Sequence, residues 1–116
     1  PGSYTGLRIG LAAAKGLAFA WGKPLLGVAA ADALAALAFD RDPAPPRVLV
    51  TLDASRGQLH ATSFVPGPDG PRAEGESTLW DPAILREGMA RPTLVVGDAA
   101  EQVADAERDA ASIDLK

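Results

Sequence analysis

The first 21 residues are apolar at almost every position, and the few polar side chains among them are spaced as on a helix. Ala, Leu, Arg and Lys dominate residues 3–21, and all four are good helix formers. Ser3 or Thr5 can accept hydrogen bonds from the free N–H groups at the helix start, whereas Gly22 followed by Pro24 gives a stop signal. The pattern therefore predicts one helix over residues 3–21.

Shorter apolar runs, separated by Pro and Gly, follow along the rest of the chain. Runs rich in Val, Leu and Thr are typical of strands, and longer Ala-rich runs are typical of helices. Predicted strands cover residues 23–28, 47–53, 57–65, 72–79 and 93–98, with a hairpin turn at 53–57 and an exposed loop at 66–71. Predicted helices cover 31–39, 81–88 and 99–111, and residues 112–116 would begin a further element. This mixture predicts a layered α/β domain with an incomplete sheet.

The opening helix has a ridge of small side chains. Gly6, Gly10, Ala14 and Ala18 recur every four residues, and Leu7, Leu11 and Leu17 flank them. A helix that is apolar nearly all round is buried on more than one side. Either its own neighbouring elements or another subunit would have to cover it, because exposing three leucines forfeits about 1.5–3 kcal/mol each.

Composition narrows the range of functions. The 116 residues are 47% hydrophobic, enough for a core, and the formal net charge is −4. A chain without a broad basic face is not expected to bind nucleic acid on its own. With no Cys, disulfides, thiolate zinc sites and Cys nucleophiles are excluded. Because basic residues divide the apolar start, no membrane span is predicted. No signal peptide is predicted either, since a basic segment before an apolar stretch is missing, and an intracellular protein is expected.

The opening loop carries groups that suit an anion. Ser3, Thr5 and Arg8 lie where free N–H groups and the helix dipole favour a phosphate or nucleotide. The spacing differs from that of a Walker A loop, because three residues separate Gly2 from Gly6 and Leu-Arg follows in place of Lys-Ser/Thr. A plain strand-to-helix turn is the alternative, and it is favoured here.

Two aspartates close predicted strands. Asp53 and Asp98 could hold Mg²⁺ or orient a hydroxyl beyond the strand ends, but turn formation is the commoner role of such aspartates and is favoured for both. His60 is the only histidine, and a solvent-facing strand position is expected for it. Ser55 near His60 lacks the third group that a catalytic triad needs. No catalytic residue and no metal site are predicted.

The opening motif resembles a known family. PGSYTGLRIG at residues 1–10, GKPL at 22–25 and GV at 27–28 are similar to the TsaB (YeaZ) family, the dimerisation subunits of the bacterial tRNA threonylcarbamoyladenosine complex. DASRG at 53–57 resembles the family's DARxGE hairpin, with Gln58 in place of Glu, and VVGDAA at 95–100 resembles its VGDGA segment. Ala30 and Ala31 depart from the family, which has a helix-capping Ser or Thr there.

The resemblance implies a fold and an arrangement of domains. The expected fold is the actin-like ATPase (ASKHA, ribonuclease H-like) domain with a mixed sheet. Family members have strands before the opening loop and more chain after residue 116, so the sequence is expected to be an internal fragment. Residues 1–40 would belong to an N-terminal subdomain with the partner-binding helices, and 47–116 would start a second α/β subdomain.

The resemblance also implies partners. Family members are noncatalytic, cytoplasmic subunits that pair with TsaD, form homodimers alone, join TsaE in a larger complex and contact tRNA only through that complex. ATP and metal are used by the partner subunits, and no cofactor is assigned to this chain. Helices equivalent to the opening and second helices form the partner interface, which would comprise Gly6, Leu7, Gly10, Leu11, Ala14, Leu17, Ala18 and Leu34.

Two alternatives stay open. One is an enzyme of the same fold, either a nucleotide-binding phosphotransferase or a glycoprotease-like peptidase. The failed Walker spacing, the single His and the absent Cys disfavour it. The other is a self-sufficient homodimer with a regulatory role, which would use the same helix face.

Overall fold

The computed structural model describes residues 3–89 and 93–103. Its elements in chain order are α1 (Tyr4–Trp21), α2 (Ala30–Phe39), β1 (Val48–Asp53), β2 (Leu59–Gly67), β3 (Gly70–Ala73), β4 (Thr78–Trp80), α3 (Pro82–Gly88), β5 (Leu94–Val96) and α4 (Ala100–Val103). The predicted helix 99–111 is described only as far as Val103, and the element predicted after residue 111 lies outside the described residues.

The strands form one mixed sheet in the order β3-β2-β1-β5, and β4 pairs with the other end of β2. β1 and β2 are antiparallel across the predicted hairpin, with Val48 opposite Phe64 and Asp53 opposite Leu59. β5 lies parallel to β1 and pairs Leu94 with Val48. A parallel neighbour needs a long crossover, which here passes through β2, β3, β4 and α3.

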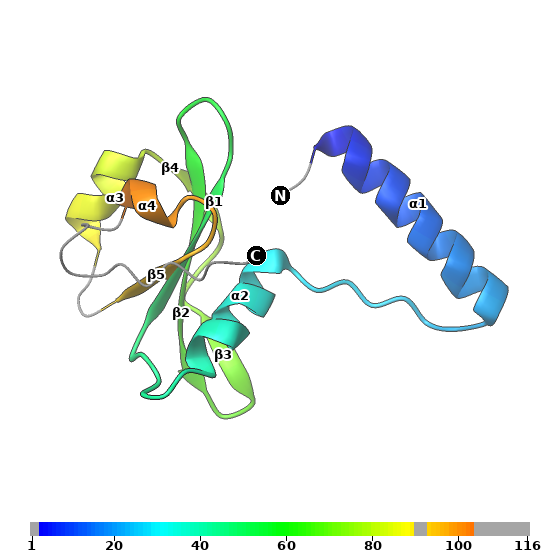
Figure 1. Ribbon diagram of the computed structural model, residues 1–116, viewed down its shortest axis with the longest axis horizontal. Helices are drawn as coiled ribbons and strands as arrows, with labels where there is room; N and C mark the ends of the chain where they lie inside the picture. Colours follow the sequence, from blue (N-terminus) through cyan, green and yellow to red (C-terminus); the bar gives the residue numbers. More distant parts are fainter. Residues whose placement is uncertain (1–2, 90–92, 104–116) are drawn as a thin grey trace.

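Helices cover both faces of this sheet (Figure 1). Val48 and Val50 of β1 point to one face, where α2 packs on them, and Leu49 points to the other, where α3 and α4 lie. The period of two along a strand produces this division. The predicted α/β mixed sheet is thereby confirmed.

α1 stands apart from the sheet (Figure 1). None of its residues is buried, and residues 23–29 connect it to α2 without regular structure. The radius of gyration is 15.8 Å, whereas a compact domain of this length has about 13 Å. The excess reflects a helix that packs on no layer of the sheet.

The strand predicted over residues 23–28 is wrong for this structure. Leu26 is 86% exposed and Val28 is 70% exposed, and no strand of residues 3–89 and 93–103 pairs with the segment. An isolated β-strand has no partner for its backbone N–H and C=O groups. The apolar pattern alone therefore did not produce a strand.

The predictions for residues 66–79 also need correction. β2 continues through Pro66 to Gly67, so a tight turn to β3 replaces the predicted exposed loop. The single strand predicted over 72–79 is two short strands, since β3 pairs with one end of β2 and β4 with the other. Gly75, with φ 101°, lies in the break between them.

Candidate partner interface

α1 is a well-capped helix that its own chain leaves uncovered. The Oγ of Ser3 accepts a hydrogen bond from Gly6 N at 3.1 Å, and Gly22 closes the other end in the left-handed region at φ 59°. These are the predicted caps. Between them, large apolar side chains face solvent: Leu7, Ile9, Leu11, Leu17, Phe19 and Trp21 are each at least half exposed.

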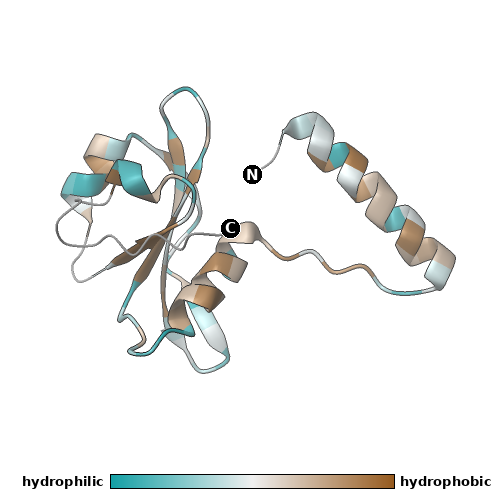
Figure 2. Cartoon of the chain, in the orientation of Figure 1, coloured by the Kyte–Doolittle hydropathy of each residue, from teal (hydrophilic) through white to brown (hydrophobic). Residues whose placement is uncertain are grey.

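The predicted ridge of small side chains is continuous and accessible. Gly10 is exposed, and a Cβ built on it would meet nothing within 4 Å. A Cβ on Gly6 would meet only the Oγ of Ser3, at 3.0 Å. Ala14 and Ala18 are half-buried, shielded by their own helix neighbours. The ridge and its leucine flanks therefore form a smooth apolar surface, interrupted elsewhere on the helix by hydrophilic positions (Figure 2).

Leu34 does not belong to this surface. It is only 8% exposed and lies in the core cluster between α2 and the sheet, together with Val48, Val50 and Phe64. Its inclusion in the predicted interface is corrected here, because α2 presents this side chain to its own sheet. Leu37, on the same helix, is 54% exposed instead.

The three residues of the predicted anion site do not converge. Ser3 uses its hydroxyl as the helix cap, and the guanidinium of Arg8 lies 5.5 Å from the centre of the Tyr4 ring. Thr5 and Arg8 line a shallow surface hollow with Ile9 and Ala12. An anion contact at these residues stays a prediction, and the observed role of Ser3 is the capping role of a helix-start turn.

The structure brings the two strand-end aspartates together. The Oδ1 of Asp98 accepts a hydrogen bond from Asp53 N at 2.8 Å, and the Oδ1 of Asp53 accepts one from Ser55 N at 3.2 Å. The Asp53 carboxylate thus serves its local hairpin turn, as predicted. The Asp98 carboxylate instead bonds across to the end of β1, 45 positions away, and not within its own turn as predicted. Within residues 3–89 and 93–103, no group of three His, Cys, Asp or Glu side chains could hold a metal.

His60 is the second residue of β2, opposite Leu52 on one side and Leu79 on the other. It is half-buried, not solvent-facing as predicted, because strands flank it on both sides. Ser55 is exposed in the hairpin turn.

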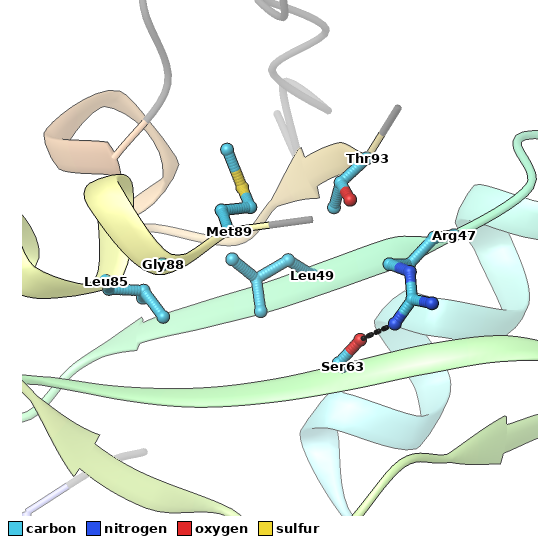
Figure 3. A pocket seen from close by; sticks show the side chains of 7 residues that line it. All are labelled: Arg47, Leu49, Ser63, Leu85, Gly88, Met89 and Thr93. Carbon is cyan, nitrogen blue, oxygen red and sulfur yellow. Dashed lines mark hydrogen bonds between the residues drawn. The ribbon is translucent and has the colours of Figure 1, made fainter. Parts of the chain in front are cut away.

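A small pocket between α3 and the sheet was not predicted (Figure 3). Leu49, Leu85 and Met89 form its apolar wall, and Arg47 and Ser63 stand at its polar end. Arg47 forms an ion pair with Glu74, and Ser63 donates to the same carboxylate at 2.9 Å. Its volume is about 200 Å³, below the roughly 300–1,000 Å³ of ordinary ligand sites. Sequence spacing gave no signal for it, because its residues come from four separate segments.

No helix in the described part of the chain is both long and apolar enough to cross a bilayer.

Known proteins match both the sequence and the fold. Residues 1–67 match the family of TsaD, tRNA N6-adenosine threonylcarbamoyltransferase. The tRNA threonylcarbamoyladenosine biosynthesis protein TsaB of Escherichia coli K12 is 33% identical over 90 residues, which are 77% of this chain and 38% of that protein.

Two solved structures from Pseudomonas aeruginosa share the fold. One, described as similar to peptidase YeaZ, is 25% identical, has a TM-score of 0.70 and matches 97% of this chain over 53% of its own. The other, YeaZ itself, is 25% identical with a TM-score of 0.68 over 90% and 51%.

This chain therefore spans 38% of its curated relative and about half of the solved structures. The structural matches confirm the predicted actin-like, ASKHA-type fold. Since the opening motif, the family match over more than half of the chain and the fold agree, the chain belongs to the TsaD and TsaB (YeaZ) family.

Proposed function

We propose that this chain is part of a noncatalytic subunit of the complex that makes threonylcarbamoyladenosine in tRNA, and that it pairs through α1 with a TsaD-type subunit. The modified adenosine lies next to the anticodon of tRNAs that read codons starting with A. In this proposal the protein works in the cytoplasm, forms homodimers alone, joins TsaE in the larger complex and contacts tRNA within it. The membership of the E. coli relative in this biosynthesis supports the proposal.

The observation that carries the pairing is Gly10. A glycine inside a helix costs about 0.5–1 kcal/mol relative to alanine. No neighbouring atom among the described residues requires this cost, because a Cβ on Gly10 would meet none of them within 4 Å. The missing side chain at Gly10 would let the backbone of a second helix approach closely along the row of Gly6, Gly10 and Ala14. The leucines beside the row would then leave water on pairing.

The noncatalytic role is supported by what the polar groups do. The carboxylates of Asp53 and Asp98 are engaged with backbone N–H groups of the hairpin. This sequence has one histidine, which lies in a strand. ATP and metal chemistry therefore belong to the partner subunits in this proposal.

Light scattering after size-exclusion chromatography tests the pairing. The full-length protein is run alone and with its TsaD, as wild type and as the Gly10→Leu variant. We expect a homodimer that becomes a heterodimer for the wild type and loss of both for Gly10→Leu, because the leucine would hold the two backbones apart. Gly88→Leu is the matched control, since Gly88 is exposed at the end of α3. Normal pairing of Gly10→Leu would refute the proposal.

A peptidase is the second candidate, because one similar structure is described as similar to peptidase YeaZ. Ser55 is the exposed hydroxyl nearest to His60 in the sequence. Peptide hydrolysis by the purified full-length protein that disappears in Ser55→Ala would favour this candidate. Hydrolysis of ATP that depends on Asp53 would favour a phosphotransferase instead.

A further inference from the structure

One side of α1 carries two cations with an aromatic ring at either end. Tyr4, Arg8, Lys15 and Phe19, here called the aromatic-basic stripe, lie within about 60° of one another around the helix. Gly10 lies about 200° around the helix from Arg8. The stripe is therefore on the side of α1 away from the centre of the small-residue ridge.

The stripe is open to solvent along its length. Phe19 is 91% exposed, the highest fraction among the large hydrophobic side chains that the structure describes, and Tyr4 is 75% exposed. The Arg8 guanidinium lies 5.5 Å from the centre of the Tyr4 ring, in the range of a cation–π contact. Among the described residues, neither Arg8 nor Lys15 has a carboxylate partner. Burial in this chain accounts for neither the rings nor the cations.

Charge is strongly segregated along the sequence. Residues 1–31 contain Arg8, Lys15 and Lys23 and no carboxylate, so they carry +3. The remaining residues, with eight cations and fifteen carboxylates, carry −7, which gives the net charge of −4. A polyanion approaching this chain would be repelled by most of it and attracted to α1.

Exposed rings beside cations are the combination that binds unpaired RNA. Bases stack on aromatic faces, and cations neutralise the phosphates between them. We propose that the aromatic-basic stripe of α1 contacts single-stranded RNA, with phosphates at Arg8 and Lys15 and unstacked bases on Tyr4 and Phe19. This inference rests on the proposed function, in which a tRNA is the substrate and the ridge of the same helix holds a protein partner.

With two or three cations, the stripe supplies an auxiliary contact within a complex and too few phosphate contacts for tight binding alone. The absence of a broad basic face elsewhere agrees with that limit. The same helix would thus hold the protein partner on its ridge and the RNA on its stripe.

The test measures RNA binding by the full-length protein in complex with its TsaD. The probe is a fluorescently labelled RNA stem-loop, and its affinity is followed by anisotropy over a series of salt concentrations. For the double variant Arg8→Ala/Lys15→Ala we expect weaker binding and a slope of log K against log salt reduced by about 1.4, for two phosphate contacts. For Phe19→Ala we expect binding weakened about tenfold, from one lost stacking contact.

Arg72→Ala is the matched control, because Arg72 is an exposed cation in β3. Its affinity should equal that of the wild type. Fully paired stem without a loop should bind the wild type and the Phe19→Ala variant alike, since its bases cannot stack on the ring.

Pairing with TsaD is measured on the same variants by light scattering. Normal pairing with reduced RNA binding supports the inference. Normal pairing with unchanged RNA binding overturns the inference and leaves the proposed function standing. Loss of pairing in Arg8→Ala/Lys15→Ala overturns it as well, because the stripe would then be protein interface. A different result would refute the proposed function, namely normal pairing of the Gly10→Leu variant with TsaD.

Discussion

Gly97 lies against the backbone of Thr51, so closely that a Cβ on Gly97 would overlap the Thr51 carbonyl oxygen. Gly97 also has φ 115°, a conformation that side chains rarely adopt. The Oγ1 of Thr51 donates to Val96 O at 3.3 Å, and Ala99 N donates to Thr51 O at 3.4 Å. This contact joins the end of β5 to β1 and fixes the path of the chain into α4.

Replacing this glycine should be costly. For Gly97→Ala we expect the free energy of unfolding to fall by about 3 kcal/mol or more, because overlap and strained backbone act together. Urea unfolding of the full-length protein measures the change. Gly88→Ala is the control, since Gly88 has open space around it. Equal stability of the two variants would contradict the close approach.

Loss of the Asp98 side chain should lower the free energy of unfolding by less than the Gly97→Ala substitution does. It accepts the N–H of Asp53 at 2.8 Å and is exposed. We expect Asp98→Ala to lower the free energy of unfolding by about 1 kcal/mol, the usual value of one hydrogen bond. Asp98→Asn keeps the acceptor oxygen and should lose less than Asp98→Ala. If both substitutions lower the free energy of unfolding equally, the side-chain oxygen has no part in holding the strand ends together.

Arg56 should be replaceable with a gain in stability. Its φ is 56°, in the left-handed region, and Ser55 and Gly57 beside it also have positive φ. A side chain there costs about 1–2 kcal/mol, part of which glycine regains. We expect Arg56→Gly to raise the midpoint of thermal unfolding and Arg72→Gly, in strand β3, to lower it. If both variants shifted the midpoint of thermal unfolding in the same direction, strain at Arg56 would be ruled out.

The start of α3 depends on Asp81. Its Oδ1 accepts a hydrogen bond from Ala83 N at 2.9 Å, and Pro82 occupies the first turn. We expect Asp81→Ala to lower the free energy of unfolding by about 1 kcal/mol, the usual cost of a lost N-cap, and Asp81→Ser to restore most of it. Chemical denaturation of both variants gives the comparison. No recovery with serine would mean that the cap is not what stabilises the helix start.

Gly10 should show opposite effects in the free and the paired protein. We expect Gly10→Ala to increase the helix signal in circular dichroism of the free protein, since alanine favours the helix by about 0.5–1 kcal/mol and meets no neighbour. Pairing should weaken, because even a methyl group separates the two backbones. Tighter pairing by Gly10→Ala would show that the glycine does not serve close approach.

Much of the fold was readable from the sequence where the signal is local. The caps Ser3, Gly22 and Asp81 satisfy backbone groups within one turn, so their residue types alone located three helix ends correctly. The hairpin at 53–57 and the buried strand β5 were also predicted, since an alternating or continuous apolar run between turn residues usually forms a strand. The family resemblance rested on the same local motifs.

The tertiary structure decided what depends on neighbours. Residues 23–28 have the composition of a strand but no strand beside them, and backbone hydrogen bonds between strands need a partner. Leu34 and Leu37 look alike in the sequence, yet packing of α2 on the sheet buries the first and exposes the second. The contact of Gly97 with Thr51 and the meeting of Asp53 with Asp98 join residues about 45 positions apart.

The sequence by itself determined the helix ends, the hairpin and the apolar ridge, since each arises from residues within a few positions. Only the tertiary structure decided which of those apolar surfaces the chain buries and which it leaves exposed, because burial is a property of the assembled layers.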